Sequence, residues 1–469
     1  MFIARENELN TLEELYSSAK FEFLVMYGRR RVGKTELLVQ FAHKHQVLFF
    51  SAQEKNDELN LMEFSERIYD YFSEDYYAPF TSWDKAFGYI AAKTAERRVT
   101  VIIDEFPFIA GPNSAVKSAL QHVIDHEMKN RNIFLILCGS SVSFMENEVM
   151  GHKSPLYGRR TYSMEVRPFD YYDSARFMGE YSTEDKLVTY GILGGIPCYL
   201  LQFDYTKSLR ENIARQIVRQ GAFLSDEPQF LLRQELREPA MYNSILEAIA
   251  CGASGLNDIA AKIKVDSSKC NKYMETLKNI RLVDRIIPCT EKPTSRKSIY
   301  RISDNYYNFW YRFIFGGRNI HALMDEYAVA DKIMSEISDY MGNIFEGICT
   351  EFMKRCIRRG DIDFTPTAIG RWWGSNPVKK CQDDIDILVI NKKEKKAIFG
   401  ECKYRNQAFD LREWEDLISA SDIMSEISDR RYILFLKSSA TKAVEDKLAA
   451  CGGRIIGPEE LLWEGSDEF

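Results

Sequence analysis

Gly28-Arg29-Arg30-Arg31-Val32-Gly33-Lys34-Thr35 is the stretch that decides the expected fold of this chain. It fits the spacing of a phosphate-binding loop, and it lies between an apolar, strand-like run over residues 21–27 and a helical pattern over 35–42. Glycines let backbone N–H groups turn inward around a phosphate, and the helix N-terminus adds its positive end. The loop therefore predicts a nucleotide site in which Lys34 reaches the β- and γ-phosphates and Thr35 offers its hydroxyl to Mg²⁺.

Polar side chains follow two further strand-like runs. Residues 99–103 are apolar and lead into Asp104 and Glu105, at the kind of strand end where α/β sheets bind ligands. We expect Asp104 to hold Mg²⁺ through water and Glu105 to polarise an attacking water, which favours hydrolysis over binding alone. The run over 133–138 ends in Gly139-Ser140-Ser141, where the Ser140 hydroxyl is a candidate γ-phosphate sensor and ordinary turn chemistry is the alternative.

The patterning divides the chain into three expected domains. Residues 1–235 alternate strand-like runs (21–27, 47–50, 99–103, 133–138 and 162–166) with helical stretches, which predicts an α/β domain with a parallel sheet. Residues 236–305 read as three short helices followed by a hairpin. Residues 306–469 begin with an aromatic-rich helical segment and continue as a second α/β region.

Composition excludes several classes of protein. The 469 residues include 62 Lys and Arg against 69 Asp and Glu, a net charge of −7, so the chain is not a generally basic nucleic-acid coat. No run of residues is long and apolar enough for a membrane span, and residues 1–6 do not resemble a signal peptide. The ten cysteines are scattered without a CxxC pair, so we expect reduced thiols in a cytoplasmic protein.

The order of motifs in the first half resembles the archaeal-type, AAA-like P-loop ATPases. The segments that carry this resemblance are residues 2–6, 28–35, 104–105, 139–141, 158–161 and 194–197. The resemblance implies ATP and Mg²⁺ as ligands and a helical lid around residues 170–235. It also implies that Arg159 or Arg160 acts near the γ-phosphate, either within one chain or from a neighbouring subunit of a homo-oligomer. A surface ion pair is the alternative role for these arginines.

The middle region predicts a winged helix, a unit that commonly reads DNA. Its helical patterns cover 241–251, 256–263 and 267–280, and its hairpin runs over 283–289 and 298–302. In the third helix an apolar face leaves Ser268, Lys269, Asn271 and Lys272 outward, while Arg296 and Lys297 lie in the hairpin turn. Between 236 and 304 there are twelve Lys and Arg against eight Asp and Glu, which favours DNA contact. A spacer or partner-docking module is the alternative.

The last region carries a second candidate site on an expected hairpin. Residues 383–390 and 397–403 read as strands around a turn at 392–395, a register that pairs 391 with 396 and 386 with 401. Because side chains alternate along a strand, Asp384, Asp386, Glu401 and Lys403 then share one face. Two carboxylates opposite each other repel, and a divalent metal would remove that penalty. Lys403 beside them could orient a water for phosphodiester attack.

This layout resembles the PD-(D/E)XK nuclease fold. The resemblance places Asp386, Glu401 and Lys403 in the catalytic motif, Asp386 and Glu401 as Mg²⁺ or Mn²⁺ ligands, and Glu346 as an additional acid from an upstream helix. The chain then reads as an ATP-binding and ATP-hydrolysing protein whose nucleotide state controls a DNA-binding, nuclease-like tail. The alternative is a regulatory switch ATPase that binds a protein or DNA partner and uses the restriction-endonuclease-like domain as a scaffold.

Overall fold

A computed structural model of the chain describes residues 2–76, 78–95, 98–321, 323–376 and 379–463. The chain forms two compact units. The first consists of Met1–Pro168 with Ile196–Cys198, and the second of Phe169–Gly195 with Tyr199–Phe469. The chain therefore passes from one unit to the other three times, and the short segment 196–198 returns to the first unit between two stretches of the second.

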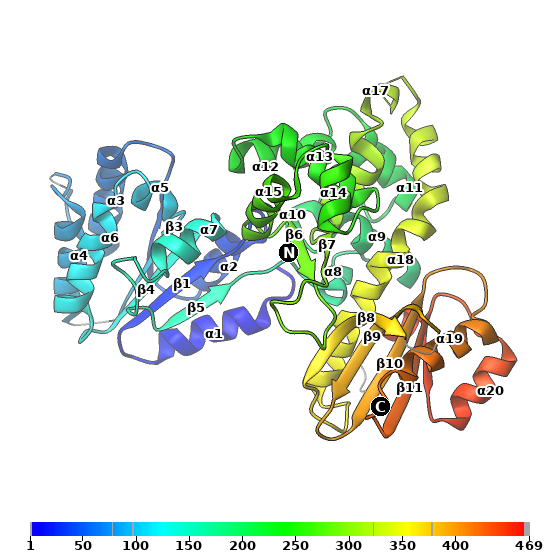
Figure 1. The fold of residues 1–469 in the computed structure, drawn as a ribbon. Helices are drawn as coiled ribbons and strands as arrows, with labels where there is room; N and C mark the ends of the chain where they lie inside the picture. The colour runs from blue at the N-terminus through cyan, green and yellow to red at the C-terminus, as the bar shows by residue number, and fades with distance from the viewer. Residues whose placement is uncertain (1, 77, 96–97, 322, 377–378, 464–469) are drawn as a thin grey trace. The chain divides into compact units, whose positions relative to one another are not determined.

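The first unit is built on a parallel sheet with the strand order β2-β3-β4-β1-β5 (Figure 1). Its strands are β1 (Glu22–Tyr27), β2 (Val47–Ser51), β3 (Val99–Asp104), β4 (Ile133–Gly139) and β5 (Tyr162–Glu165). Its helices are α1 (Glu6–Ser17), α2 (Lys34–Ala42), α3 (Asp57–Phe72), α4 (Trp83–Ala92), α5 (Pro107–Ala110), α6 (Ala115–Val123) and α7 (Val142–Phe144), with π-helical turns at Ile124–Met128 and Met145–Val149. The predicted strands agree with these to within one residue at each end.

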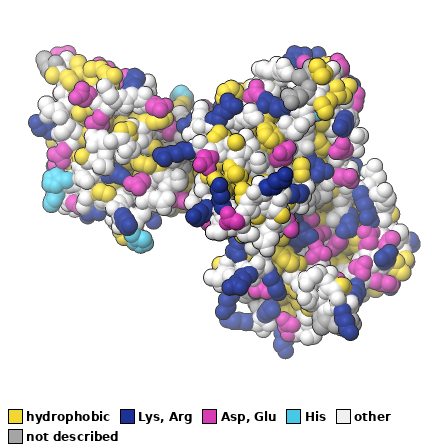
Figure 2. Space-filling model, turned by 45° about the horizontal axis from the view of Figure 1, so that its top comes forward, with side chains coloured by type: hydrophobic (Ala, Val, Ile, Leu, Met, Phe, Trp, Pro, Cys, Tyr) yellow, Lys and Arg dark blue, Asp and Glu magenta, His cyan; other side chains and the backbone are white. Residues whose placement is uncertain are grey.

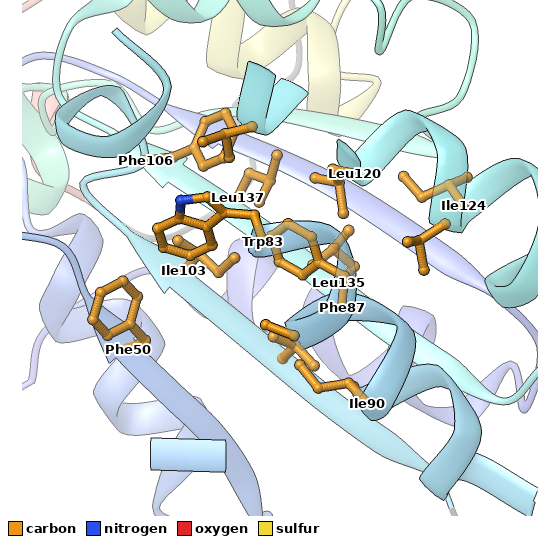
Figure 3. Close-up of a cluster of buried hydrophobic side chains, with 14 of the residues drawn as sticks. Phe50, Trp83, Phe87, Ile90, Ile103, Phe106, Leu120, Ile124, Leu135 and Leu137 are labelled. Atoms are coloured by element: carbon orange, nitrogen blue, oxygen red, sulfur yellow. The ribbon is translucent and has the colours of Figure 1, made fainter. Parts of the chain in front are cut away.

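Both faces of this sheet are buried, which explains why its strands are apolar without alternation. Along β1, Phe23 and Val25 belong to the hydrophobic cluster under α3, α4 and α6, whereas Leu24 and Met26 belong to the cluster under α1 and α2. Trp83 and Phe87 from α4 lie among side chains of β3 and β4 in the first cluster (Figure 3). The two cores hold the sheet rigid beneath the loops at its edge.

The second unit begins with short helices that pack on the aromatic segment near residue 310. These elements are α8 (Tyr171–Ala175), α9 (Thr183–Leu193), α10 (Pro197–Leu200), α11 (Leu209–Asn212), α12 (Phe223–Glu235), α16 (Asn305–Trp310) and α17 (Arg318–His321), with π-helical turns at Ile213–Val218 and Tyr311–Phe315. Tyr306 donates a hydrogen bond to the carbonyl of Leu224, and the Trp310 indole donates to that of Ser225 at 2.8 Å. Apart from residues 196–198, the predicted lid over 170–235 is thus grouped with the C-terminal region and not with the phosphate-loop unit, because these buried aromatic rings anchor it there.

Three helices and a two-stranded hairpin follow the lid helices. They are α13 (Pro239–Ala250), α14 (Leu256–Lys262), α15 (Ser267–Asn279), β6 (Val283–Ile286) and β7 (Ile299–Ile302). On α15, Cys270, Met274 and Leu277 are fully buried, as the apolar pattern predicts. The polar residues on the other side of this helix are exposed.

The C-terminal region carries a mixed sheet with the order β12-β11-β10-β9-β8 (Figure 1). Its elements are α18 (Glu326–Arg359), β8 (Ala368–Asn376), β9 (Cys381–Asn391), β10 (Lys396–Lys403), α19 (Leu411–Asp422), β11 (Asp429–Leu436), α20 (Lys442–Ala450), β12 (Arg454–Ile456) and α21 (Pro458–Leu461). Strands β8, β9 and β10 are antiparallel neighbours, and β11 runs parallel to β10 after the crossover through α19. Among the described helices, none has the length and apolar character needed to cross a membrane.

Candidate functional site

The loop between β1 and α2 has a backbone that requires glycine at its first position. Gly28 has φ 156°, and a Cβ atom there would lie 2.2 Å from the carbonyl oxygen of Val166 in the loop after β5. Gly33 has φ 91° immediately before α2. A Cβ atom on Gly33 would touch the ring of Pro197, in the segment that returns to this unit. The conformation thus depends on both glycines, as expected for a loop whose amides face a ligand.

Lys34 is folded back onto the loop. Its side chain is only 5% exposed, and its Nζ donates hydrogen bonds to the carbonyls of Gly28 (2.8 Å) and Arg29 (2.9 Å). Burial lowers the pKa of the ammonium group, and the nearby Cys138, Glu105 and Asp104 oppose that shift. Phosphate oxygens carry charge, so they would form stronger bonds to this ammonium group than the two carbonyls do.

The polar side chains predicted at the other strand ends lie together at this edge of the sheet. The Thr35 hydroxyl donates a hydrogen bond to Asp104 at 2.7 Å. Glu105, in the left-handed region with φ 50°, accepts hydrogen bonds through Oε2 from the backbone N–H (3.2 Å) and hydroxyl (2.9 Å) of Ser140. A hydroxyl and one or two carboxylates, completed by phosphate oxygens, are the ligands that Mg²⁺ prefers at a nucleotide. The residues present therefore fit that metal.

Arg5 supports the loop from behind, a role that sequence reasoning did not assign. Its side chain is buried and donates to the carbonyls of Val32 (3.1 Å) and Arg167 (2.6 Å) and to the carboxylate of Glu8 (2.8 Å). Arg5 has φ 70° and immediately precedes α1. It lies in the short stretch 2–6 that carried part of the family resemblance, which was its only signal in the sequence.

The two candidate arginines do not join the loop residues of the same chain. Arg159 binds Asp125 through two nitrogens and holds the pKa of that carboxyl down at about 2, which matches the ion-pair alternative. Arg160 is exposed and precedes β5, which runs parallel to β1 with Leu24 opposite Tyr162. It therefore lies near the amino ends of these strands, whereas the phosphate loop lies at their carboxyl ends. The prediction that Arg160 acts on the nucleotide of its own chain is wrong for this structure. Action on a neighbouring copy stays a proposal.

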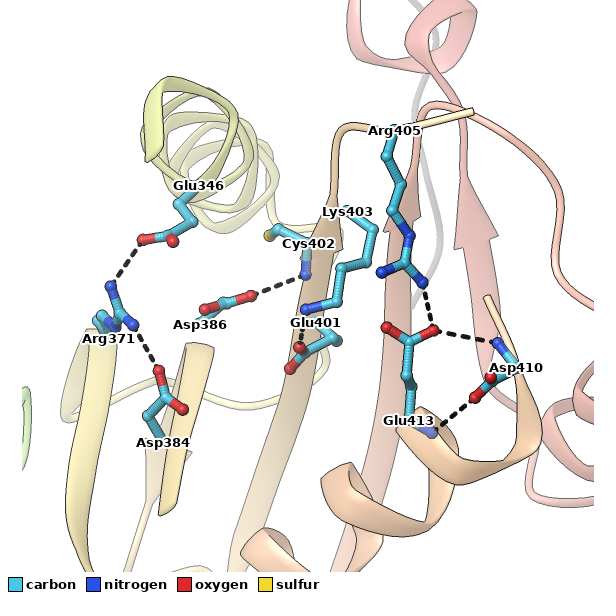
Figure 4. A network of polar contacts seen from close by, with 10 residues as sticks. All are labelled: Glu346, Arg371, Asp384, Asp386, Glu401, Cys402, Lys403, Arg405, Asp410 and Glu413. Carbon is cyan, nitrogen blue, oxygen red and sulfur yellow. Dashed lines mark hydrogen bonds and ion pairs between the residues drawn. The ribbon is translucent and has the colours of Figure 1, made fainter. Parts of the chain in front are cut away.

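A second polar site lies on the mixed sheet of the other unit. The predicted hairpin register is confirmed from Lys396↔Asn391 to Gly400↔Ile387. Beyond that pair the ladder ends, and Oδ2 of Asp386 accepts a hydrogen bond from the backbone N–H of Cys402 at 3.0 Å (Figure 4). We call the following set of residues the acidic cluster: Arg301, Glu346, Arg371, Asp384, Asp386, Glu401 and Lys403.

Burial and like charge dominate this cluster. Asp386 is 8% exposed, and burial together with Glu401 and Glu346 raises its pKa to about 8. Burial also raises the pKa of Glu401, although Lys403 opposes that shift through a contact of 2.5 Å. Burial lowers the pKa of Lys403, but Glu401 and Asp386 outweigh it, so the net shift is upward. The lysine is therefore an ammonium group beside two carboxyls that resist ionisation.

Glu346 is held by cations. It accepts hydrogen bonds from Arg301 of β7 at 2.8 Å and from Arg371 of β8 at 3.1 Å, and Arg371 also contacts Asp384 (Figure 4). No pattern in the sequence pointed to Arg301. The sequence pattern assigned no role to Arg371 either.

The acidic cluster does not form a preassembled metal cage. In the part of the chain that the structure describes, no group of three or more His, Cys, Asp and Glu residues is placed to hold a metal ion. Glu346 was expected to complete a metal site with Asp386 and Glu401. It does not, because its carboxylate binds the guanidinium groups of Arg301 and Arg371 instead. Four carboxylates face three cations in the cluster, and Asp386 forms no ion pair among the described residues. Its oxygens, with those of Glu401, still have the chemistry that suits Mg²⁺ or Mn²⁺.

The parallel sheet, the glycine-bounded loop and the Thr35–Asp104 pair define the first unit as a P-loop ATPase domain. Residues 2–203 match the family described as an ATPase domain predominantly from Archaea, and residues 310–416 match a family of archaeal and bacterial proteins of unknown function. The Walker-type ATPase PABY2304 of Pyrococcus abyssi has a similar fold, with a TM-score of 0.50 and 21% identity over 66% of this chain and 96% of that one.

Two proteins of Methanocaldococcus jannaschii are related in sequence. MJECL04 is 32% identical over 414 residues, which cover 87% of this chain and 88% of that protein. The ATP-binding protein MJ0423 is 40% identical over 47 residues, 10% of this chain and 80% of that protein. The chain belongs to the family of P-loop ATPases found predominantly in Archaea, and it shares with MJECL04 nearly its whole length.

Replacing Lys34 by alanine tests the phosphate loop. Lys34→Ala removes the ammonium group that is placed to meet the β- and γ-phosphates, a charge-assisted bond worth about 1.5–3 kcal/mol, so ATP affinity should fall roughly tenfold to a hundredfold or more. Isothermal titration with MgATP measures the loss. The matched control is Lys44→Ala, because Lys44 is largely exposed just beyond the same helix. Equal affinities for Lys34→Ala and the unaltered protein would contradict the assignment.

Replacing Asp386 by asparagine tests the charge state of the acidic cluster. The pKa of Asp386 is about 8 in the folded chain against an ordinary value of 3.8, so ionisation destabilises the fold progressively as pH rises from about 4 to about 8. The substituted carboxamide would be neutral, and its oxygen could still accept the hydrogen bond from the Cys402 N–H. Asp386→Asn should therefore gain stability over the unaltered protein as pH rises from 5 to 8, by at most about 1.4 kcal/mol per pH unit.

Urea denaturation in EDTA measures this difference at each pH. Asp446→Asn is the control, because Asp446 is exposed on α20 and pairs with exposed Lys442. A stability difference between Asp386→Asn and the unaltered protein that stays constant across this pH range would show that Asp386 is not a strained carboxyl.

Proposed function

We propose that ATP binding and hydrolysis in the first unit control a DNA-binding, metal-dependent phosphodiesterase site in the second. The observation that carries the second half is the buried Asp386 beside Glu401, with the Lys403 ammonium 2.5 Å from Glu401. A protein gains no stability from two such carboxyls side by side, and groups with pKa values shifted this far cluster at functional sites.

In the first unit the chain's own groups would divide the work of hydrolysis. The Lys34 ammonium would leave the carbonyls of Gly28 and Arg29 for the phosphates, and the loop amides would hold the remaining oxygens. Glu105, positioned by its two bonds from Ser140, would orient the attacking water. Mg²⁺ held at Thr35 and Asp104 would neutralise charge that develops on the phosphates.

In the second unit the helices α13, α14 and α15 with the β6–β7 hairpin have the order of a winged helix. Lys269 and Lys272 are exposed on α15, and Arg296 and Lys297 are exposed in the hairpin turn. Basic and acidic side chains are interspersed over the face of the molecule in Figure 2. DNA binding would therefore rest on a local set of contacts such as these, with Ser268 and Asn271 near base edges.

The mixed sheet supports the nuclease-like interpretation. A long helix, three antiparallel strands, a crossover helix and a parallel strand follow in the order α18, β8, β9, β10, α19 and β11, which is the core order of PD-(D/E)XK enzymes. Asp386 and Glu401 would hold a divalent metal that polarises the phosphodiester. Lys403 would orient or activate the attacking water, and its ammonium would stabilise the charge that develops.

One observation favours the rival function, a switch ATPase that cuts nothing. Glu346 is bound by Arg301 and Arg371, and Glu401 by Lys403, so most of the cluster is neutralised without a metal. In that case the mixed sheet would serve as a scaffold, and the winged helix would bind a protein or DNA partner.

Cleavage assays with variants of the acidic cluster decide between the two functions. Asp386→Ala or Lys403→Ala should reduce Mg²⁺- or Mn²⁺-dependent cleavage by at least about a hundredfold, the usual size of such contributions, while ATP hydrolysis stays largely intact. Duplex, single-stranded and branched DNA are each incubated with and without ATP. Glu105→Gln, which should retain ATP and slow its hydrolysis, shows whether cleavage follows the nucleotide state. An unaltered protein that cleaves none of these substrates under any condition supports the scaffold.

The winged helix makes a separate prediction about salt. Each phosphate neutralised on duplex DNA contributes roughly −0.9 to the slope of log affinity against log salt concentration. Replacing Arg296 and Lys297 together by alanine should therefore weaken binding across unrelated sequences and flatten this slope by about two units. Fluorescence anisotropy over a salt series measures it. An unaltered slope in the double variant would place the DNA contact elsewhere in the chain.

A further inference from the structure

A cleft with a volume of about 600 Å³ opens in the second unit next to the acidic cluster. It is lined by residues of α9, α13, the β6–β7 hairpin, α16, the turn Tyr311–Phe315, α18 and β8, including Arg301, Arg312, Asn343, Gly347, Arg371 and Trp373. A cube of that volume is about 8 Å on a side, narrower than the major groove of DNA, which is about 12 Å wide. A duplex is wider than its own groove, so a whole duplex does not fit inside the cleft, whereas a short segment of one strand does.

Three guanidinium groups line this cleft. Arg301 and Arg371 both donate to Glu346 and belong to the acidic cluster, so the cleft adjoins that cluster. Arg312 is exposed, lies near the ring of Phe313, and forms no ion pair with another described residue. Guanidinium groups pair with phosphate through fixed, planar sets of donors. The cleft thus presents one uncommitted cation and two that already bind a carboxylate.

Trp373 gives the cleft an aromatic surface. Its neighbour on β8, Trp372, packs against the hydrophobic core of the mixed sheet. Because side chains alternate along a strand, Trp373 lies on the other face, where it is partly exposed and lines the cleft. An indole beside guanidinium groups is the combination on which single-stranded nucleic acids stack their bases.

Three carboxyl residues also line the cleft. Asp284 and Asp339 are exposed, where water screens their charge. Glu351 is half-buried, and desolvation together with Asp170 raises its pKa to about 7, so its charge is only partial near neutral pH. These groups weaken the positive potential of the cleft without cancelling the local contacts of the arginines.

We propose that this cleft binds a single nucleic-acid strand beside the acidic cluster, with Arg301, Arg312 and Arg371 contacting phosphates and Trp373 stacking on a base. The proposal rests on the proposed function, and it names the form of substrate: a single-stranded segment, not an intact duplex. A phosphate bound by Arg301 and Arg371 would compete with Glu346 for both guanidinium groups. Substrate binding would thereby release the Glu346 carboxylate toward Asp386 and Glu401.

Binding measured in EDTA tests the cleft without any cleavage. The probe is a labelled oligothymidylate of about eight nucleotides, within the range of single-strand sites, followed by anisotropy and by tryptophan fluorescence of the full chain. Trp373→Ala should weaken binding about fivefold to a hundredfold, the effect of losing one stacked base, whereas Trp373→Phe should retain most of the affinity. Arg312→Ala should flatten the salt slope by about 0.7, the contribution of one phosphate of a single strand. Lys442→Ala is the control, because it removes an exposed cation on α20 that does not line the cleft, and it should bind this probe normally.

Several results would overturn the proposal. If both Trp373→Ala and Arg312→Ala bind the oligonucleotide with wild-type affinity, the strand does not bind in this cleft. If a blunt duplex shows the same dependence on Trp373, the cleft does not select single strands. If AMP or ATP, tested in a Lys34→Ala background, depends on Trp373 while the oligonucleotide does not, the phosphate comes from a free nucleotide.

The cleft and the proposed cleavage can fail separately. Trp373-dependent strand binding in a protein that never cuts supports the cleft and removes the nuclease. If the protein cleaves DNA equally well in Trp373→Ala and Arg312→Ala, the nuclease function is supported and the role of the cleft is contradicted.

Discussion

The first unit depends on the parallel direction of its five strands, because that direction brings separate segments of the chain to one edge. The phosphate loop follows β1. Asp104 is the last residue of β3 and Glu105 comes directly after it, and Ser140 follows β4. Each is positioned by a strand buried on both faces, so the edge is held rigidly while its loops stay open to a ligand. The same direction places Arg160, two residues before β5, at the opposite ends of the strands. Topology alone thus decides which polar groups can meet one nucleotide.

In the second unit the corresponding constraint is the cost of keeping several carboxylates out of water. Arg301 and Arg371 neutralise Glu346, and Lys403 neutralises Glu401, while burial and the charges of Glu401 and Glu346 keep the pKa of Asp386 at about 8. Such a set responds strongly to any added charge. A divalent cation would favour the ionised acids, and a phosphate would draw the guanidinium groups away. A metal ion would thus act on the carboxylates of the cluster, and the substrate would act on its guanidinium groups.

Local patterns predicted much of this molecule. In the first unit the apolar runs set the strand ends to within one residue, and in the second the four-residue turn at 392–395 set the register of the β9–β10 hairpin, because a strand alternates with a period of two. Long-range packing was not predictable. Nothing in the residues near Tyr306 shows that its hydroxyl reaches Leu224, and nothing near Arg301 shows that it meets Glu346, 45 residues away. Such contacts determine that the lid helices pack with the C-terminal region. They also determine that Glu346 is already bound by arginines.

The return of segment 196–198 to the first unit has a consequence for how this protein can change over time. Two ready-made domains joined end to end would share one crossing of the chain, whereas these units share three. The returning Pro197 stands against Gly33 of the loop, while Gly195, one residue outside the segment, has no room for a side chain against the Phe169 carbonyl. An exchange of the whole ATPase part between relatives, segment 196–198 included, would have to carry residues 169–195 of the second unit with it. The two units are therefore expected to be inherited as a matched pair.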